Sequence, residues 1–283
     1  MLPYDGIIRT GSKGMSHFAR NADKDPQRVA QGTGKAGQKQ PASAVRLSMN
    51  AVCCYTAPQD YTRWMEKMQN MEQARFNMIE QQIRPWDVLD TRILDLLHRI
   101  RREHFVPADK KAMAFMDMEI PLGQGACMWP PKLEARVLQE LHIKRSDRVL
   151  EVGTGSGYLT ALLCALSSHV TSVEIEPQLG EIANAHLHAH HCENVTLETG
   201  DASHGWEGKY DVIVLTGSTP VLPKSFQESL NVGGRLFAIV GDAPVMEARL
   251  ITRAAPDVFE TVNMLETCIA PLKNAEQPAR FVF

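Results

Sequence analysis

The sequence predicts an α/β fold: a doubly wound sheet of about seven strands with helices on both faces, preceded by an N-terminal helical segment. Two observations lead to this prediction. After residue 142, short β-type runs alternate with helical runs of roughly ten to fifteen residues, which is the pattern of βαβ units. The run Tyr210 to Thr216 is almost continuously apolar, as expected of a parallel strand that helices cover on both faces.

The composition restricts the class of protein. Of the 283 residues, 44% are hydrophobic and 22% are charged, the balance of a soluble globular protein. The formal net charge of −3 lacks the basic excess of nucleic-acid binders. No apolar run approaches the roughly 20 residues that span a membrane, and the start of the chain lacks an apolar signal core. Six cysteines without a C-x-x-C motif indicate reduced thiols. We therefore expect a cytoplasmic protein that binds neither nucleic acid nor membranes.

Residues 1–70 are predicted to lie outside the folded domain. The first sixty residues contain eight Lys or Arg and four Asp, and residues 31–44 contain no large apolar side chain. Such a segment cannot offset its ordering entropy by burial, so we expect disorder or a non-native extension. We expect the working protein to begin near Met68 or Met71, with a domain over 71–283. Expression of the chain from Met71 tests this, and loss of folding or activity would contradict it.

The first part of the domain, residues 71–141, is predicted to be a helical cap that carries a substrate loop. The run Phe76 to Ile83 has helical character, and Pro85 separates it from a second helix. That helix has one apolar stripe, formed by Leu89, Ile93, Leu96, Leu97 and Ile100. Residues 121–131 are loop by composition, and Lys132 to Leu141 is predicted to be a further helix.

The second part, residues 142–283, is predicted to form the sheet. Strands are expected at 148–152, 169–175, 194–198, 210–216, 235–240, about 247–253 and about 258–268. Helices are expected at 158–167, 178–191 and 222–230. Because strands and helices alternate in most of this part, the carboxyl ends of the strands should share one edge, where open α/β sheets bind ligands.

A glycine-rich stretch joins the first of these strands to its helix. Residues 151–158 read EVGTGSGY, with glycine at every second position from Gly153. Alternate glycines allow a ligand to approach the backbone closely. Glu174 ends the next strand, 21 residues after the first glycine, where an acid can accept hydrogen bonds from ribose hydroxyls. The dinucleotide fingerprint requires glycine at 158, and Tyr158 stands there, which disfavours a nicotinamide cofactor.

The E-x-G-x-G-x-G form resembles the S-adenosylmethionine loop of class I methyltransferases, which have a Rossmann-like sheet. The resemblance implies that the glycines admit the cofactor, that Glu174 holds its ribose, and that Asp201 contacts its adenine amino group. An ordinary turn aspartate is the other interpretation of Asp201. The residues expected to bind S-adenosyl-L-methionine are Glu151, Gly153, Thr154, Gly155, Gly157, Tyr158, Glu174, Ile175, Asp201 and Ala202.

From residue 74 to the end, the chain resembles the protein-L-isoaspartate O-methyltransferase family. Residues 101–107 are similar to the family's R-x-x-F-V-P ending of its N-terminal helix. Residues 120–125 resemble its P-I-G-x-G-Q loop, and residues 216–220 its T-A-A-A-P segment. The resemblance implies methyl esterification of isoaspartyl carboxylates in damaged proteins, which is a protein-repair function.

One segment departs from the family pattern. The family has T-I-S-A-P-H-M after the Gly-Gln loop, with its Ser in the active site, whereas residues 127–133 read CMWPPKL. Aligning Pro131 with the family's proline places Trp129 at the Ser and Lys132 at the His. The hydroxyl that would orient an isoaspartyl carboxylate is missing; Lys132 could attract that carboxylate, and Trp129 could stack on the acceptor or fill the lid. The candidate acceptor-site residues are Trp129, Lys132, Thr216 and Ser218, with Cys127 and Thr219 as further hydrogen-bonding groups.

Two alternative functions stay open. A methyltransferase of the same fold could act on a small-molecule acceptor, which the departure at Trp129 favours. A cofactor-binding protein that no longer catalyses and works by interaction would carry the same glycine loop. No metal site is expected, because His186 and His190 lack a third ligand at a suitable spacing. The expected partners are isoaspartyl-containing proteins or a small acceptor, and no oligomeric state is predicted.

Overall fold

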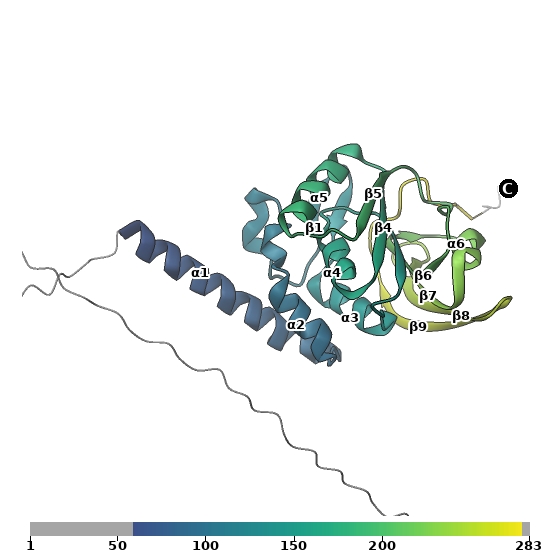
Figure 1. Cartoon of the computed structure of the whole chain (residues 1–283), viewed down its shortest axis with the longest axis horizontal. Helices are drawn as coiled ribbons and strands as arrows, with labels where there is room; N and C mark the ends of the chain where they lie inside the picture. The colour runs from purple at the N-terminus through teal and green to yellow at the C-terminus, as the bar shows by residue number, and fades with distance from the viewer. Residues whose placement is uncertain (1–58, 279–283) are drawn as a thin grey trace, which may run out of the picture. The chain divides into compact units, whose positions relative to one another are not determined.

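The computed structural model describes residues 59–278 and confirms the predicted α/β fold (Figure 1). A seven-stranded sheet has the order β5-β4-β3-β6-β7-β8-β9. Its strands are β3 (Arg148–Val152), β4 (His169–Glu174), β5 (Val195–Thr199), β6 (Tyr210–Thr219), β7 (Leu230–Val240), β8 (Met246–Ala255) and β9 (Val258–Thr267). The five strands β5, β4, β3, β6 and β7 are parallel to one another. Strand β8 pairs antiparallel with β7, and β9 pairs antiparallel with β8. The strand order reverses between β3 and β6, so a ligand cleft is expected at the carboxyl ends of these two strands.

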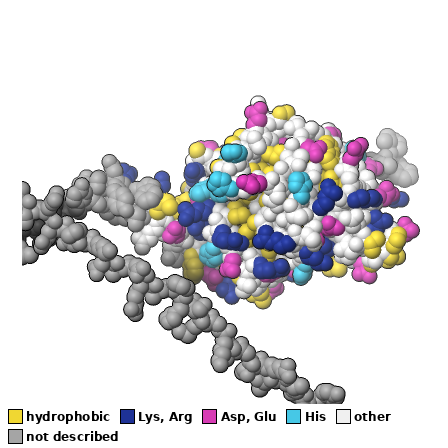
Figure 2. All heavy atoms as spheres, viewed as in Figure 1, with side chains coloured by type: hydrophobic (Ala, Val, Ile, Leu, Met, Phe, Trp, Pro, Cys, Tyr) yellow, Lys and Arg dark blue, Asp and Glu magenta, His cyan; other side chains and the backbone are white. Residues whose placement is uncertain are grey.

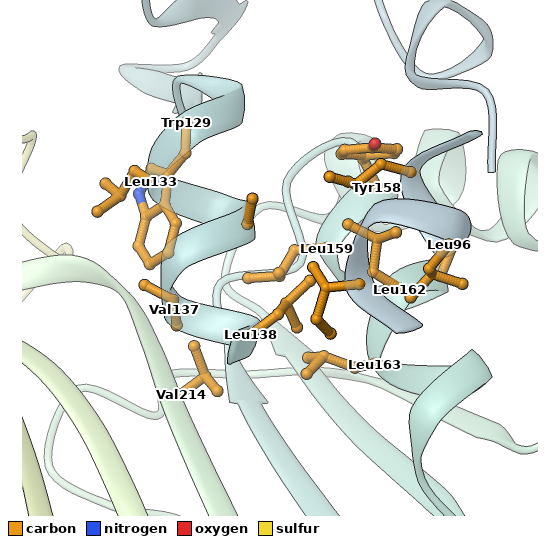
Figure 3. Packing of buried hydrophobic residues seen from close by; sticks show 14 of the residues in the cluster. Leu96, Trp129, Leu133, Val137, Leu138, Tyr158, Leu159, Leu162, Leu163 and Val214 are labelled. Atoms are coloured by element: carbon orange, nitrogen blue, oxygen red, sulfur yellow. The ribbon is translucent and has the colours of Figure 1, made fainter. Parts of the chain in front are cut away.

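Helices cover both faces of the sheet. The helices that pack on it are α3 (Pro131–Leu141), α4 (Tyr158–Leu166), α5 (Pro177–Ala189) and α6 (Lys224–Ser229). Val149 of β3 packs in the core that contains α3 and α4, whereas its neighbour Leu150 packs in a second core with Phe226 of α6. Figure 3 shows the first core, with Leu133 of α3 beside Trp129 and Leu162 of α4 across from them. Burial on both faces explains the nearly continuous apolar runs of the inner strands.

The helical segment ahead of the sheet begins earlier than predicted. It consists of α1 (Gln59–Asn77), a π-helical turn (Met78–Ile83), a 3-10 turn (Arg84–Trp86) and α2 (Thr91–Arg99), followed by 3-10 turns at Arg102–His104 and Ala108–Met113. Helical structure therefore covers residues 59–70, which we expected to be disordered; the rest of that expectation concerns residues 1–58, which lie outside the described part. Among the described helices, none is both long enough and apolar enough to cross a bilayer.

The predicted apolar stripe of α2 needs one correction. Leu89 is 65% exposed, whereas Ile93, Leu96 and Leu97 are buried. The helix starts after Leu89, because the Asp90 carboxylate accepts a hydrogen bond from the backbone N–H of Arg92 (2.9 Å) and so acts as the N-cap. Leu89 therefore lies outside the helical repeat that the sequence pattern assigned to it.

The expected loop at 121–131 contains a short β-hairpin. Strands β1 (Ile120–Gly123) and β2 (Ala126–Met128) pair antiparallel, with Ile120 opposite Met128. The turn between them uses left-handed backbone at Gly123, Gln124 and Gly125 (φ +98°, +53° and +78°), which glycine adopts without steric cost. The composition of residues 121–131 thus predicted the turn but not the two short strands on either side of it.

Charge is unevenly distributed over the surface. Figure 2 shows a row of Lys and Arg side chains across the middle of one face. A basic cavity of about 940 Å³ lies between α2, the loop from α3 to β3 and the end of α4, and its charged lining is Arg92, Asp95, His98, Arg99, His142, Lys144 and Arg145. Within residues 59–278 the cysteines are free thiols, and no three His, Cys, Asp or Glu side chains gather as a metal site.

Candidate functional site

Two neighbouring cavities lie at the carboxyl ends of the parallel strands. The larger, about 130 Å³, lies between the glycine loop, the β1–β2 hairpin and residues 269–273. The smaller, about 40 Å³, lies between the ends of β3 and β4 and residues 200–203 that follow β5. Both are lined by Gly153, Glu174 and Ile175, and neither shares a residue with the basic cavity. These two cavities form the candidate site.

The backbone of the glycine loop has conformations that require glycine. Gly153 has φ +97°, and a Cβ added there would overlap the hydroxyl oxygen of Thr216. That hydroxyl donates to the carbonyl oxygens of Val152 (2.9 Å) and Gly153 (2.8 Å), which fixes the end of β3 against β6. The loop therefore presents bare backbone to the larger cavity.

Glu174 connects the glycine loop to the end of β4. One carboxylate oxygen accepts the backbone N–H of Gly155 (2.8 Å), and the other accepts that of Glu176 (3.0 Å). The side chain is 6% exposed and lines both cavities. A buried carboxylate in this position can accept hydrogen bonds from a diol that lies between the two cavities.

Glu151 is a buried acid with one unused oxygen. Its Oε2 atom accepts hydrogen bonds from the hydroxyls of Thr160 and Ser172 (2.6 Å each). Its Oε1 atom has no hydrogen-bond partner among the described residues, and the residue lines the larger cavity. Burial raises the pKa of Glu151 to about 8, although the two hydroxyl hydrogen bonds favour the charged form. A cationic ligand group at Oε1 would satisfy this oxygen.

Asp201 lies at the smaller cavity, after β5. Its Oδ1 atom accepts the backbone N–H of Ser203 (2.9 Å), and its Oδ2 atom accepts the side-chain amide of Asn274 (2.8 Å). Slight burial raises the pKa of Asp201, but the hydrogen bonds from Ser203 and Asn274 outweigh this and lower it below its ordinary value. The carboxylate is therefore charged at neutral pH and already holds an amide donor.

Trp129 lines the larger cavity directly after the β1–β2 hairpin. Its indole N–H donates to the backbone carbonyl of Thr216 (2.8 Å), and its ring lies edge-on to Phe237 at 5.8 Å between centroids. The side chain is 5% exposed and packs beside Leu133 and Val137 of α3 (Figure 3). Its polar atom is committed to the backbone, so its ring acts as an apolar wall.

The other predicted acceptor residues are placed differently. Thr216 lines the larger cavity, whereas Lys132 and Ser218 line neither cavity. The Lys132 ammonium lies 2.6 Å from Asp117 and 3.9 Å from the centroid of the Trp86 ring. The Ser218 hydroxyl is fully buried and donates to the carbonyl of Ile269 (3.2 Å). Lys132 and Ser218 thus hold neighbouring segments together.

Most of the predicted cofactor residues lie around the two cavities. The lining of one or both contains Glu151, Gly153, Thr154, Gly155, Glu174, Ile175, Asp201 and Ala202. Gly157 and Tyr158 line neither; Gly157 approaches Ala183 of α5, and the Tyr158 ring lies in the core against Phe105. These two residues belong to the packing of α4 behind the loop.

A buried arginine that the sequence reasoning missed supports the wall of the larger cavity at Trp129. Arg102 is 0% exposed and forms an ion pair with Glu134 of α3. Its guanidinium also donates to the carbonyls of Ala114 (3.0 Å) and Trp129 (2.5 Å). Burial raises the pKa of Glu134 to about 7, against the attraction of Arg102. Through these contacts Arg102 connects the segment before β1, which contains Ala114, to Trp129 and to Glu134 of α3.

Glu119 is a second functional candidate that sequence reasoning missed. It directly precedes β1 and lines the larger cavity, half-buried. No ion-pair partner is found for it within residues 59–278. Burial raises the pKa of Glu119 above its ordinary value, and its charge in turn raises the pKa of Cys127 after burial of that thiol. The sequence around Glu119, a single acid before a loop with Pro and Gly, does not indicate that its side chain lines a cavity.

The fold and the site together define a class. An open sheet with this strand order carries a bare glycine loop after β3. Acids follow the next two strands, and all three elements meet at the switch point. These features define a class I S-adenosylmethionine-dependent methyltransferase.

Comparisons with known proteins agree. A sequence model of the protein-L-isoaspartate(D-aspartate) O-methyltransferase family matches residues 73–277. The protein-L-isoaspartate O-methyltransferase of Protochlamydia amoebophila is 37% identical over 204 residues, which cover 70% of this chain and 96% of the relative. That of Methanoculleus marisnigri is 35% identical over 201 residues, covering 70% and 90%. The chain therefore belongs to the protein-L-isoaspartate(D-aspartate) O-methyltransferase family, as its motifs predicted.

The fold has a solved counterpart. A crystal structure of a putative protein-L-isoaspartate O-methyltransferase from Plasmodium falciparum, in complex with S-adenosyl-L-homocysteine, has a TM-score of 0.61 and 18% identity to this chain. The similarity covers 70% of this chain and 97% of that chain. At this level of identity it supports the shared fold.

Proposed function

We propose that the protein is an S-adenosylmethionine-dependent O-methyltransferase that esterifies isoaspartyl carboxylates in damaged proteins. The observation that carries the proposal is one cavity in which the glycine loop faces the β1–β2 hairpin and Thr216. Membership of the family over residues 73–277 supports the same activity. The expected partners are proteins that contain isoaspartyl residues.

The residues of the two cavities fit S-adenosylmethionine, which supplies an activated methyl group when bound. We propose that the unused oxygen of Glu151 accepts its ammonium group, which is the interaction this buried acid lacks. Glu174 would accept the ribose hydroxyls, and Asp201 the adenine amino group. The glycine backbone leaves room for the cofactor between these carboxylates. The ammonium group, the ribose hydroxyls and the adenine amino group of the cofactor thus each meet an acid of the chain.

The acceptor chemistry needs little from the protein beyond positioning. A carboxylate is already ionised near neutral pH, because its ordinary pKa is about 4. Its oxygen forms a bond to the methyl carbon while the carbon–sulfur bond breaks and that electron pair stays on sulfur, which yields a methyl ester and S-adenosylhomocysteine. Holding the oxygen about 3 Å from the carbon, in line with sulfur, can lower the barrier by several kcal/mol.

We propose Glu119 as the group that positions the acceptor carboxylate in place of the missing hydroxyl. The indole N–H of Trp129 is occupied by Thr216, so it does not supply this hydrogen bond. Burial raises the pKa of Glu119, and its protonated form can donate to an incoming carboxylate. Two carboxyl groups that share one site raise the pKa of one of them further. The pair can therefore share a proton.

A pH profile tests the role of Glu119. The pKa of Glu119 is raised from 4.5, so the donor is present below that raised value and is lost as the pH rises through it. We expect kcat/KM for an isoaspartyl peptide to fall by roughly tenfold as the pH rises through this pKa, the effect of about one pKa unit of interaction. Glu119→Gln keeps a donor at every pH, so this fall should be absent from its profile.

Other ionisable groups line the same cavity, so the role of Glu119 is decided by comparing the variant with the wild type. They are Cys127, Glu134, Glu151, Glu174, Glu176 and Lys273. Glu260→Gln, on exposed β9, is the matched control and should keep the wild-type profile. A profile of Glu119→Gln that coincides with the wild type would show that Glu119 does not meet the acceptor.

A small-molecule acceptor is the second candidate. The side chain of Trp129 reduces the space at the acceptor side, and Leu122, Met128, Leu159 and Ile269 add further apolar wall. Such a lining favours a carboxylate attached to a compact apolar body. The same cofactor residues would serve both candidates.

Labelled cofactor separates the two candidates. We expect the full chain to transfer a base-labile methyl group from S-adenosylmethionine to an isoaspartyl peptide and not to the matching aspartyl peptide. Cofactor binding without labelling of the peptide would exclude the repair activity. Labelling of a low-molecular-weight lysate fraction in that case would favour the small acceptor.

A further inference from the structure

The chain returns to the candidate site after β9. Pro271 pairs with Ser218 at the end of β6 in an isolated parallel bridge, and the backbone N–H of Leu272 donates to the Ser218 carbonyl (2.8 Å). A turn follows, in which the N–H of Ala275 donates to the carbonyl of Leu272 (3.2 Å). We call residues 271–275 the C-terminal strap. Its two anchors place it across the carboxyl edge of the sheet.

The strap separates the two cavities of the site. Leu272 and Lys273 line both of them, together with Gly153, Glu174 and Ile175. The separate volumes of about 130 and 40 Å³ lie below the roughly 300–1,000 Å³ of typical ligand pockets. A cofactor that reaches from the glycine loop to Asp201 must occupy both cavities. It must therefore pass beneath the strap.

Two side chains hold the strap in this position. The Lys273 ammonium lies 2.5 Å from a carboxylate oxygen of Glu176, and the Asn274 amide donates to Oδ2 of Asp201 (2.8 Å). Asn274 has a left-handed backbone (φ +60°), which asparagine tolerates better than most residues. The ion pair is 42% and 27% exposed, and exposed ion pairs contribute little to stability. The Lys273–Glu176 contact is therefore a weak restraint on this end of the strap.

The contact at Asp201 resembles the contact expected of the cofactor. The side-chain amide of Asn274 and the exocyclic amino group of adenine are both NH₂ donors attached to a planar carbon. Oδ1 of Asp201 is already bonded to the backbone of Ser203, which leaves Oδ2 for either donor. Both donors are therefore directed to the same oxygen atom of Asp201.

We propose that the C-terminal strap is a gate over the cofactor cleft, in which Asn274 holds Asp201 until the adenine amino group of the cofactor replaces it. Cofactor entry and product release then require the strap to move away from Asp201 and Glu176. The inference rests on the proposed placement of adenine at Asp201, and it adds a residue that controls cofactor exchange.

Binding of S-adenosylhomocysteine to the full chain tests the gate. We expect Asn274→Gly, which keeps the left-handed turn and removes the competing amide, to bind faster and roughly two- to tenfold tighter, the range for one net hydrogen bond. Asn274→Asp should act in the same direction, because its carboxylate repels Asp201. Asn263→Ala, on exposed β9, is the control and should bind as the wild type does. Association rates by stopped flow and Kd by calorimetry provide the two readouts.

Each outcome has a distinct meaning. Unchanged binding by both Asn274 variants would overturn the gate, and weaker binding would show that Asn274 is a permanent part of the cofactor site. Glu174→Ala separates this test from the proposed function. If Glu174→Ala leaves binding unchanged, the placement of the cofactor itself is wrong; if it weakens binding while the Asn274 variants do not improve it, only the gate fails.

Discussion

Replacing Arg102 by methionine should lower the free energy of unfolding by about 3–5 kcal/mol, the cost of breaking a buried ion pair from one side. Arg102 and Glu134 are both almost inaccessible to solvent (0% and 2% exposed). Without the guanidinium, Glu134 must take up a proton or keep an uncompensated buried charge, and the carbonyls of Ala114 and Trp129 lose their donor. Chemical denaturation of the purified variant measures the change.

The neighbouring residue provides a matched control. Arg101 forms a longer, exposed contact with Glu72 (3.6 Å), so Arg101→Met should cost at most about 1 kcal/mol. A loss of similar size in both variants would contradict the special role of Arg102. The double variant Arg102→Met, Glu134→Leu should recover part of the loss, because it removes the unpaired charge and leaves the two carbonyls unsatisfied.

The loss should also depend on pH. The pKa of Glu134 is raised from 4.5 to about 7 in the folded protein. Its contribution to stability is therefore full below pH 4.5 and is lost as the pH rises through about 7. The attraction of Arg102 limits that loss in the wild type. The deficit of Arg102→Met should consequently be larger at pH 8 than at pH 5, and an equal deficit would mean that Glu134 does not titrate in this range.

The fold was predictable because its signals are local. Alternating β and helical runs, and the glycines that follow β3, are read within a few residues of sequence. The boundaries were less predictable, because they depend on single caps. Asp90 excludes Leu89 from α2, and left-handed residues between β1 and β2 turn an apparent loop into a hairpin.

The candidate site was predictable only in its cofactor half. The glycine loop and the acids at the ends of β4 and β5 lie within a few residues of a strand end, in the strand–loop–helix pattern. The acceptor half is built by contacts between distant residues, such as Trp129 with Thr216 and Arg102 with the carbonyl of Trp129. Sequence spacing does not reveal that Lys132 is held by Asp117 outside the cavity. Tertiary packing therefore decides which polar side chains remain available to a substrate.

Replacing Gly153 by alanine should weaken the binding of S-adenosylhomocysteine at least about tenfold, equivalent to about 1.4 kcal/mol. The backbone of Gly153 is left-handed (φ +97°), which strains any residue with a Cβ by about 1–3 kcal/mol. The added carbon would also overlap the hydroxyl oxygen of Thr216, which is held by two carbonyls of the same loop. Relief of that overlap must displace the loop that faces the cavity. Calorimetric titration of the variant measures the effect.

Two further variants separate strain from overlap. Gly233→Ala introduces similar strain (φ +82°) at an exposed position of β7 with no neighbouring atom within 4 Å, so it should lower stability and leave cofactor binding unchanged. Adding Thr216→Ala to Gly153→Ala removes the overlapping oxygen and should restore part of the affinity, although the strain at residue 153 stays. Wild-type affinity in Gly153→Ala alone would mean that the cofactor does not approach this backbone. In that case the loop would serve only to join β3 to α4, and the ligand would have to be held by the carboxylates alone.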